Sequence, residues 1–196
     1  MQTNESPQGN LHPLGREGGQ FDLIRLAGLN ARPSQMKYSD ISEVKLISGG
    51  PIPSLSEVLE RYSSMNYFIE IKVEHFDNKA ARLVDLVANN IYASRLIDRS
   101  IVISFSGEAI DYLTEHYPDI RSGLDFDDPG LLEDAQSKYG VLLPHYFLIS
   151  QDFCRNLRKP VIPWTVDDVE LANKLKKLGC KGIITNVGDR MLSAIK

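Results

Sequence analysis

The chain has 196 residues, of which 42% are hydrophobic and 24% charged, as expected for a globular protein with a substantial core. Its net charge of -4 gives no basis for nucleic-acid binding, which favours a basic face. No apolar run reaches the ~20 residues that span a bilayer, so we expect no transmembrane segment. The two cysteines, Cys154 and Cys180, lack zinc-site spacing and fit either two thiols in a reducing compartment or one disulfide. Without a secretory signal pattern, we expect a cytoplasmic protein.

The N-terminal segment differs in composition from the rest of the chain. Residues 1–19 are rich in Gly, Pro, Asn, Gln and Ser, which predicts a disordered polar tail. We expect residues 20–196 to form a single domain. Its first segment, Phe21–Leu26, is predicted to be a short strand, and a helical turn is predicted within Ser39–Leu46.

From Pro51 onward, short apolar strands alternate with amphipathic helices. The predicted strands lie at residues 67–73, 101–105, 121–126, 141–143, 161–166 and 181–185. This alternation favours a parallel sheet covered by helices, either an open doubly wound sheet or a β/α barrel. No Gly-x-Gly-x-x-Gly follows a strand, so a dinucleotide site has no support. A closed barrel has eight strands, so this chain would lack about two strand–helix units.

Two charged residues share one face of the first of these strands. Glu70 and Lys72 are two positions apart, so both side chains point to the barrel interior, while Ile69 and Ile71 point to the helices. The carboxyl ends of barrel strands are where such folds carry out chemistry. Phosphodiester cleavage needs oxygen ligands for a divalent cation and a cationic group for the developing negative charge. An ion pair that only fills a layer of the barrel is the alternative interpretation.

Five fragments, in their order and spacing, resemble the pattern of the glycerophosphodiester phosphodiesterase family. They are Ile52-Pro-Ser-Leu-Ser-Glu-Val-Leu59, Ile69-Glu-Ile-Lys72, Ile103-Ser-Phe105, Trp164-Thr-Val-Asp167 and Gly182-Ile-Ile-Thr-Asn186. The resemblance implies an α/β protein with a TIM-type β/α barrel that lacks the first one or two strand–helix units. It also implies a role in lipid metabolism, through metal-dependent hydrolysis of glycerophosphodiesters to glycerol phosphate and an alcohol.

The same resemblance assigns roles to three residues. Glu70 would bind a divalent cation, Mg²⁺ or Ca²⁺, and Lys72 would be catalytic. Trp164 would line the substrate pocket beside the glycerol moiety, although plain core packing explains a tryptophan equally well. The expected partner is a glycerophosphodiester or another phosphorylated small molecule.

The family's first-strand motifs have no counterpart here. Nothing matches His-Arg-Gly, Pro-Glu-Asn or Glu-x-Asp, and the second histidine aligns either with Phe21 or with His12. His75 and His145 follow predicted strands and could reach the mouth of the barrel. We therefore expect hydrolysis by this chain to be very weak or absent. A non-catalytic relative that binds a phosphorylated ligand or a protein partner is the alternative.

The missing strands also predict a property of the sheet. Six parallel strands cannot close a barrel, which would leave the strands at residues 67–73 and 181–185 with open edges. Open apolar edges recruit other strands, so we expect the chain to self-associate through them, to aggregate or to show a loose open edge.

Overall fold

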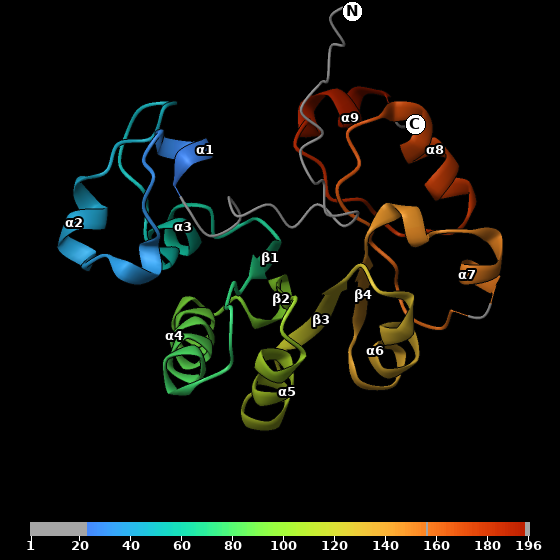
Figure 1. Ribbon diagram of the computed structural model, residues 1–196, viewed down its shortest axis with the longest axis horizontal. Coiled ribbons are helices and arrows are strands. Elements are labelled where there is room, and N and C mark those ends of the chain that lie inside the picture. The colour runs from blue at the N-terminus through green and yellow to red at the C-terminus, as the bar shows by residue number, and fades with distance from the viewer. Residues whose placement is uncertain (1–22, 156, 195–196) are drawn as a thin grey trace, which may run out of the picture. The chain divides into compact units, whose positions relative to one another are not determined.

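The computed structural model describes residues 23–155 and 157–194, which belong to two compact units (Figure 1). The first unit ends at Ser54 and the second begins at Leu55. The predicted tail, residues 1–19, lies outside the described residues, as do Phe21 and His12.

The first unit consists of short helices and turns. It contains α1 (Ile24–Ala27), the 3₁₀ helix Pro33–Gln35 and α2 (Tyr38–Glu43). The prediction of a strand at Phe21–Leu26 is wrong for the described part of that segment, because Ile24 begins a helix. Gly28 ends this helix with a φ of 66°, a left-handed conformation that glycine adopts without strain. A strand of four apolar residues and a helical turn cannot be told apart by periodicity alone.

The second unit contains the predicted alternation of strands and helices. Its four assigned strands are β1 (Tyr67–Glu70), β2 (Ser100–Ser104), β3 (Arg121–Phe126) and β4 (Val141–Pro144). They pair in parallel and in sequence order, β1-β2-β3-β4. The helices are α3 (Leu55–Arg61), α4 (Asn78–Ser94), α5 (Gly107–His116), α6 (Leu132–Lys138), α7 (Gln151–Arg155), α8 (Val169–Lys177) and α9 (Gly188–Ala194). Short 3₁₀ helices lie at Ile97–Arg99, Pro129–Leu131 and Tyr146–Leu148.

The last two predicted strands, at 161–166 and 181–185, continue the sheet without forming assigned strands. The amide of Ile162 donates to Leu142 (2.9 Å), and the amide of Lys181 donates to Val161 (2.9 Å). Val161 and Trp164 form isolated parallel bridges to the β4 side. Proline has no amide hydrogen, so Pro163 cannot donate a hydrogen bond to a neighbouring strand. The ladder of backbone hydrogen bonds is therefore interrupted within residues 161–166.

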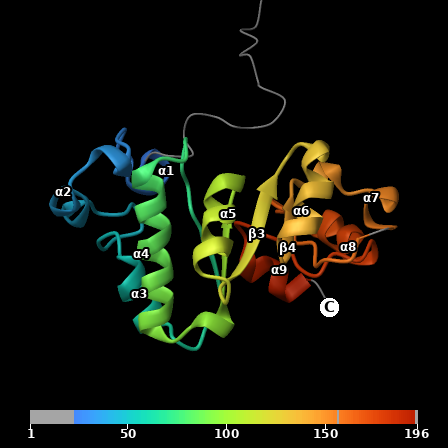
Figure 2. The ribbon, with the colours of Figure 1, turned by 90° about the horizontal axis from the view of Figure 1, so that it is seen from below.

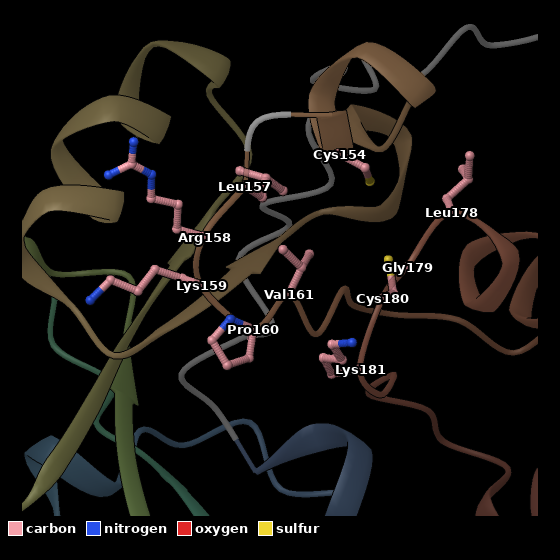
Figure 3. Close-up of a pocket in the computed structure, with 10 residues that line it drawn as sticks. All are labelled: Cys154, Leu157, Arg158, Lys159, Pro160, Val161, Leu178, Gly179, Cys180 and Lys181. Atoms are coloured by element: carbon pink, nitrogen blue, oxygen red, sulfur yellow. The ribbon is translucent and has the colours of Figure 1, made fainter.

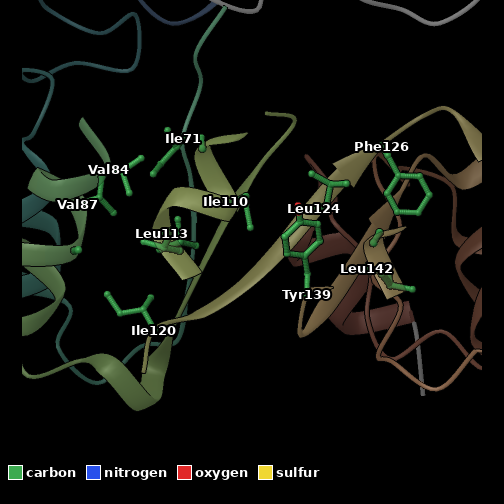
Figure 4. Close-up of a cluster of buried hydrophobic side chains, with 14 of the residues drawn as sticks. Ile71, Val84, Val87, Ile110, Leu113, Ile120, Leu124, Phe126, Tyr139 and Leu142 are labelled. Atoms are coloured by element: carbon green, nitrogen blue, oxygen red, sulfur yellow. The ribbon is translucent and has the colours of Figure 1, made fainter. Parts of the chain in front are cut away.

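Two faces of the sheet carry different residues. Leu124 and Phe126 of β3 pack with α4 and α5 in one hydrophobic cluster (Figure 4). Ile71, which directly follows β1, belongs to the same cluster, and the sequence predicted that its side chain would point to the helices. Figures 1 and 2 show α4, α5 and α6 along this outer side of the strands. Gly123 and Asp125, the alternate positions of β3, lie on the inner face.

The inner face has its own small core. It consists of Ile103, Val141 and Leu143, against which Ile162, Trp164 and Ile184 pack. Parallel pairing, outer helices and a filled inner face are the features of a β/α barrel, here a partial one. Among the described residues, no helix is both long and apolar enough to span a bilayer.

Candidate functional site at the carboxyl end of the sheet

Glu70 and Lys72 meet at the end of β1. Glu70 is the last residue of the strand, and the Lys72 ammonium donates to Glu70 Oε1 in an ion pair. The two side chains keep 31% and 37% of their surface exposed, respectively, so the pair is partly solvated and contributes little to folding stability. Both charged groups therefore lie at the carboxyl end of β1 and are partly open to solvent.

Asp125 is the site residue that the sequence analysis missed. It lies near the end of β3 and is 3% exposed, and its Oδ2 has no hydrogen-bond partner among residues 23–155 and 157–194. Burial, and next the negative charge of Glu70, raise the pKa of the Asp125 carboxyl well above its ordinary value, while Lys72 opposes the shift. Asp125 thus shares an electrostatic environment with the predicted pair Glu70 and Lys72.

A signal for Asp125 was present in the sequence. Aspartate is disfavoured in buried strands, and Asp125 lies within a segment predicted to be one. It also alternates with the outward-facing Leu124 and Phe126, the same pattern that singled out Glu70 on the earlier strand.

Aromatic side chains line the next part of the mouth. Trp164 makes edge-to-face contacts with Phe105, at 5.1 Å between ring centroids, and with His145, at 4.7 Å. Its indole Nε1–H donates to the Leu143 carbonyl (2.7 Å), which fixes the ring beside β4. Trp164 thus lies at the carboxyl end of the sheet, as Glu70 and Lys72 do, and it is half-buried rather than fully packed.

His145 is held as a neutral ring. The amide of Phe147 donates to His145 Nδ1 (3.4 Å), which places the ring hydrogen on Nε2. Burial lowers the pKa of His145, while the nearby buried carboxyl of Asp127 opposes that shift. The ring lies between Trp164 and the exposed Phe147, so it extends the aromatic wall toward solvent.

The last two segments of the sheet are joined by Asp167. Its carboxylate accepts hydrogen bonds from Thr185 Oγ1 (2.8 Å) and from the amide of Asn186 (2.7 Å). The hydrogen bonds from Asn186 and Thr185 lower the pKa of Asp167. Because these donors already use its oxygens, Asp167 connects the two segments structurally.

The two other histidines among the described residues make no contact with the aromatic wall. His116 ends α5, where its ring stacks on Tyr112 at 4.0 Å and its Nδ1 contacts the Tyr112 carbonyl. His75 is exposed beyond β1. Neither contributes a contact to the wall formed by Trp164.

The described residues do not fit a divalent-cation site by themselves. Residues 23–155 and 157–194 contain no group of three or more His, Cys, Asp or Glu side chains placed to hold a metal ion. Glu70 is engaged by Lys72, and Asp125 has a raised pKa that favours its neutral form. Mg²⁺ and Ca²⁺ require several oxygen ligands, so further ligands would be needed beside Glu70.

Comparisons with known sequences point to one family. Residues 19–190 match the model of the glycerophosphoryl diester phosphodiesterase family. A glycerophosphodiester phosphodiesterase of Caldanaerobacter subterraneus subsp. tengcongensis is 23% identical over 156 residues, which are 76% of this chain and 64% of that protein. The chain thus spans under two thirds of that relative's length.

Solved structures show the same fold. One is a phosphodiesterase of Oleispira antarctica in complex with the product sn-glycerol-3-phosphate, with a TM-score of 0.77 and 18% identity over 88% of this chain and 76% of that one. Another is a glycerophosphodiester phosphodiesterase of Parabacteroides distasonis, with a TM-score of 0.71 and 19% identity over 80% of this chain and 69% of that one. These likenesses bear out the partial TIM-type barrel.

Proposed function

The chain belongs to the glycerophosphoryl diester phosphodiesterase family, and from this membership we propose that it binds a glycerophosphodiester or another phosphorylated small molecule at the carboxyl end of its sheet. Lys72 contacts the phosphate in this proposal, and Trp164 contacts the glycerol moiety. The bound product in the Oleispira antarctica relative supports this class of ligand.

The observation that carries the proposal is the grouping of Lys72, Glu70 and Asp125 beside an aromatic wall. Two uncompensated carboxylates would repel a phosphate, but here Lys72 neutralises Glu70. The raised pKa of Asp125 favours a neutral carboxyl, which can donate a hydrogen bond to a phosphate oxygen. The mouth of the sheet therefore offers a cation and a neutral acid to the phosphate.

Hydrolysis to glycerol phosphate and an alcohol is the second part of the proposal. In that reaction Glu70 is a ligand of Mg²⁺ or Ca²⁺ and Lys72 stabilises negative charge on the phosphoryl group. We expect the rate to be very low, because acid–base catalysis by a positioned histidine is worth ~10²–10⁴-fold and nothing in the sequence matches the family's His-Arg-Gly motif.

The absence of a metal-binding group among the described residues favours a second candidate function. This is a non-catalytic relative that binds a phosphorylated ligand or a protein partner. The two candidates share the ligand site and differ only in turnover. For either, we propose a cytoplasmic location, which the two free thiols support. We also propose a role in lipid metabolism, which follows from the family alone.

Isothermal titration calorimetry with glycerol 3-phosphate and with glycerophosphocholine tests the binding proposal. Lys72→Met should weaken phosphate binding by about tenfold to a hundredfold, as expected for one charge-assisted hydrogen bond. Lys174→Met removes an exposed lysine of α8 with the same change of charge and should bind as the wild type does. Absence of binding to the wild type, or equal loss in both variants, would refute the site.

A coupled assay for released glycerol 3-phosphate separates the two candidates. Slow turnover of glycerophosphocholine that requires Mg²⁺ or Ca²⁺ and disappears in Glu70→Gln favours the enzyme. Binding without turnover favours the non-catalytic relative. Robust turnover that survives Glu70→Gln would mean that the active site lies elsewhere.

A further inference from the structure

The two cysteines of the chain line one cavity near residues 160–161 and 178–181, away from the site described above. This cavity has a volume of about 290 Å³, and its wall includes Cys154, Cys180, Leu157, Val161 and Lys181. Val161 and Lys181 begin the last two segments of the sheet, so the cavity lies at the amino end of these segments and Trp164 lies toward their other end. It is separate from the proposed ligand site.

Each cysteine is fixed by its own element. Cys154 lies in α7, where its amide donates to the Ser150 carbonyl (3.1 Å). Cys180 follows Gly179, whose φ of 100° turns the chain out of α8, and its amide donates back to Leu175 (3.2 Å). These backbone hydrogen bonds hold the two cysteines, which are 26 positions apart in the sequence, at the wall of the same cavity.

The thiols face each other. Figure 3 shows the two sulfur atoms directed toward one another, whereas Arg158 and Lys159 point away from them. Each thiol affects the pKa of the other, and both residues are half-buried. Two thiols that face each other and line one cavity can be reached by a small molecule.

We propose that Cys154 and Cys180 are a redox-active dithiol, which a small-molecule disulfide such as oxidised glutathione converts into an intramolecular disulfide bond. In the first step, the Cys154 thiolate attacks one sulfur of the oxidant, whose S–S bond breaks and releases one reduced thiol. In the second step, Cys180 loses its proton, attacks the Cys154 sulfur and releases the second thiol. Two protein thiols are oxidised and one external disulfide is reduced.

The order of the two steps follows from the surroundings of the two thiols. Burial raises the pKa of Cys154, and the neighbouring Cys180 thiol partly opposes that shift. Burial and the neighbouring Cys154 raise the pKa of Cys180 to about 11, so Cys180 reacts second. Since the thiolate is the nucleophile, the reaction should accelerate as the pH rises from 7 to 9.

Intact-mass spectrometry of the full chain after incubation with oxidised glutathione tests the proposal. The wild type should lose about 2 Da and both reactive thiols, with no increase in oligomer mass. Cys180→Ser should stop at a mixed disulfide that adds about 305 Da, and Cys154→Ser should react much more slowly. The same incubation in urea, where the fold no longer holds the thiols together, should close the ring more slowly.

Three results would overturn the proposal. They are a wild type that accumulates two stable mixed disulfides, a wild type that stays unreacted while Cys180→Ser reacts, and ring closure that is as fast in urea as in the folded chain. Circular dichroism of each variant checks that the substitution has preserved the fold.

Discussion

Asp125 offers a test of the site that does not depend on a ligand. Its carboxyl is buried, and its folded-state pKa is raised mainly by that burial and then by Glu70. The folded protein therefore binds a proton at this group more tightly than the unfolded chain does. The resulting stability is fully present below the unfolded pKa and is lost as the pH rises through the folded pKa. Asp125→Asn removes this dependence, because asparagine is neutral at every pH.

The size of the effect can be bounded. Each unit by which the folded pKa is raised costs about 1.4 kcal/mol of unfolding free energy at a pH above both pKa values. At pH 7 the cost cannot exceed about 4 kcal/mol. This limit applies when the folded carboxyl is still protonated at pH 7 while the unfolded carboxyl titrates at its ordinary pKa of 3.8. We therefore expect Asp125→Asn to be more stable than the wild type at pH 7, by no more than about 4 kcal/mol, and equal to it near pH 4.

Urea unfolding measured between pH 4 and pH 8 checks this expectation, with Trp164, the single tryptophan, as the fluorescent probe. Asp98→Asn, at an exposed position, is the matched control and should show little difference from the wild type at any pH. If Asp125→Asn destabilised the protein at pH 7, or changed stability equally at all pH values, the carboxyl would be ionised and stabilised in the fold, and the reasoning would fail.

Three further predictions concern packing and assembly. Gly123→Ala should lower the free energy of unfolding by about 1–3 kcal/mol in urea titrations, because a Cβ there would lie 2.6 Å from Leu143 Cδ1; unchanged stability would contradict the tight inner face. Tyr139→Phe should cost about 1 kcal/mol by the same assay, since the 1% exposed Tyr139 donates to Asp111 Oδ1 (2.7 Å); a more stable variant would refute that hydrogen bond. Static light scattering should show a mass that rises with concentration as sheet edges pair; a constant monomer mass would argue against open edges.

Most of the second unit could be predicted from the sequence, because short apolar strands alternate with amphipathic helices and the two faces of a strand carry different residue types. At the end of β1, alternation predicts that Glu70 and Lys72 point to one face and Ile71 to the other. The structure places Ile71 in the core on the helix side. The segment 161–166 fits less well, because Pro163 removes an amide from the ladder. It is still extended and hydrogen-bonded to β4, as its apolar residues indicated.

The features that could not be predicted depend on contacts between distant residues. Alternation in β3 points Asp125 inward, but its proximity to Glu70 and Lys72 depends on how neighbouring strands pack, which no local pattern specifies. The placement of Cys154 and Cys180 around one cavity requires α7 and the end of α8 to come together. At Ile24–Ala27 the local pattern was itself ambiguous, and helical hydrogen bonds formed where a strand was predicted.

The most direct test of the central claim is to locate the bound ligand by nuclear magnetic resonance. Titration of the ¹⁵N-labelled chain with glycerophosphocholine should shift the amides of Lys72 and Phe105 and the indole signal of Trp164, whose Nε1–H lies beside β4. Lys72→Met should reduce these shifts at the same ligand concentration. Shifts confined to the cavity around Cys154, or none at saturating ligand, would contradict a phosphorylated-ligand site at the carboxyl end of the sheet.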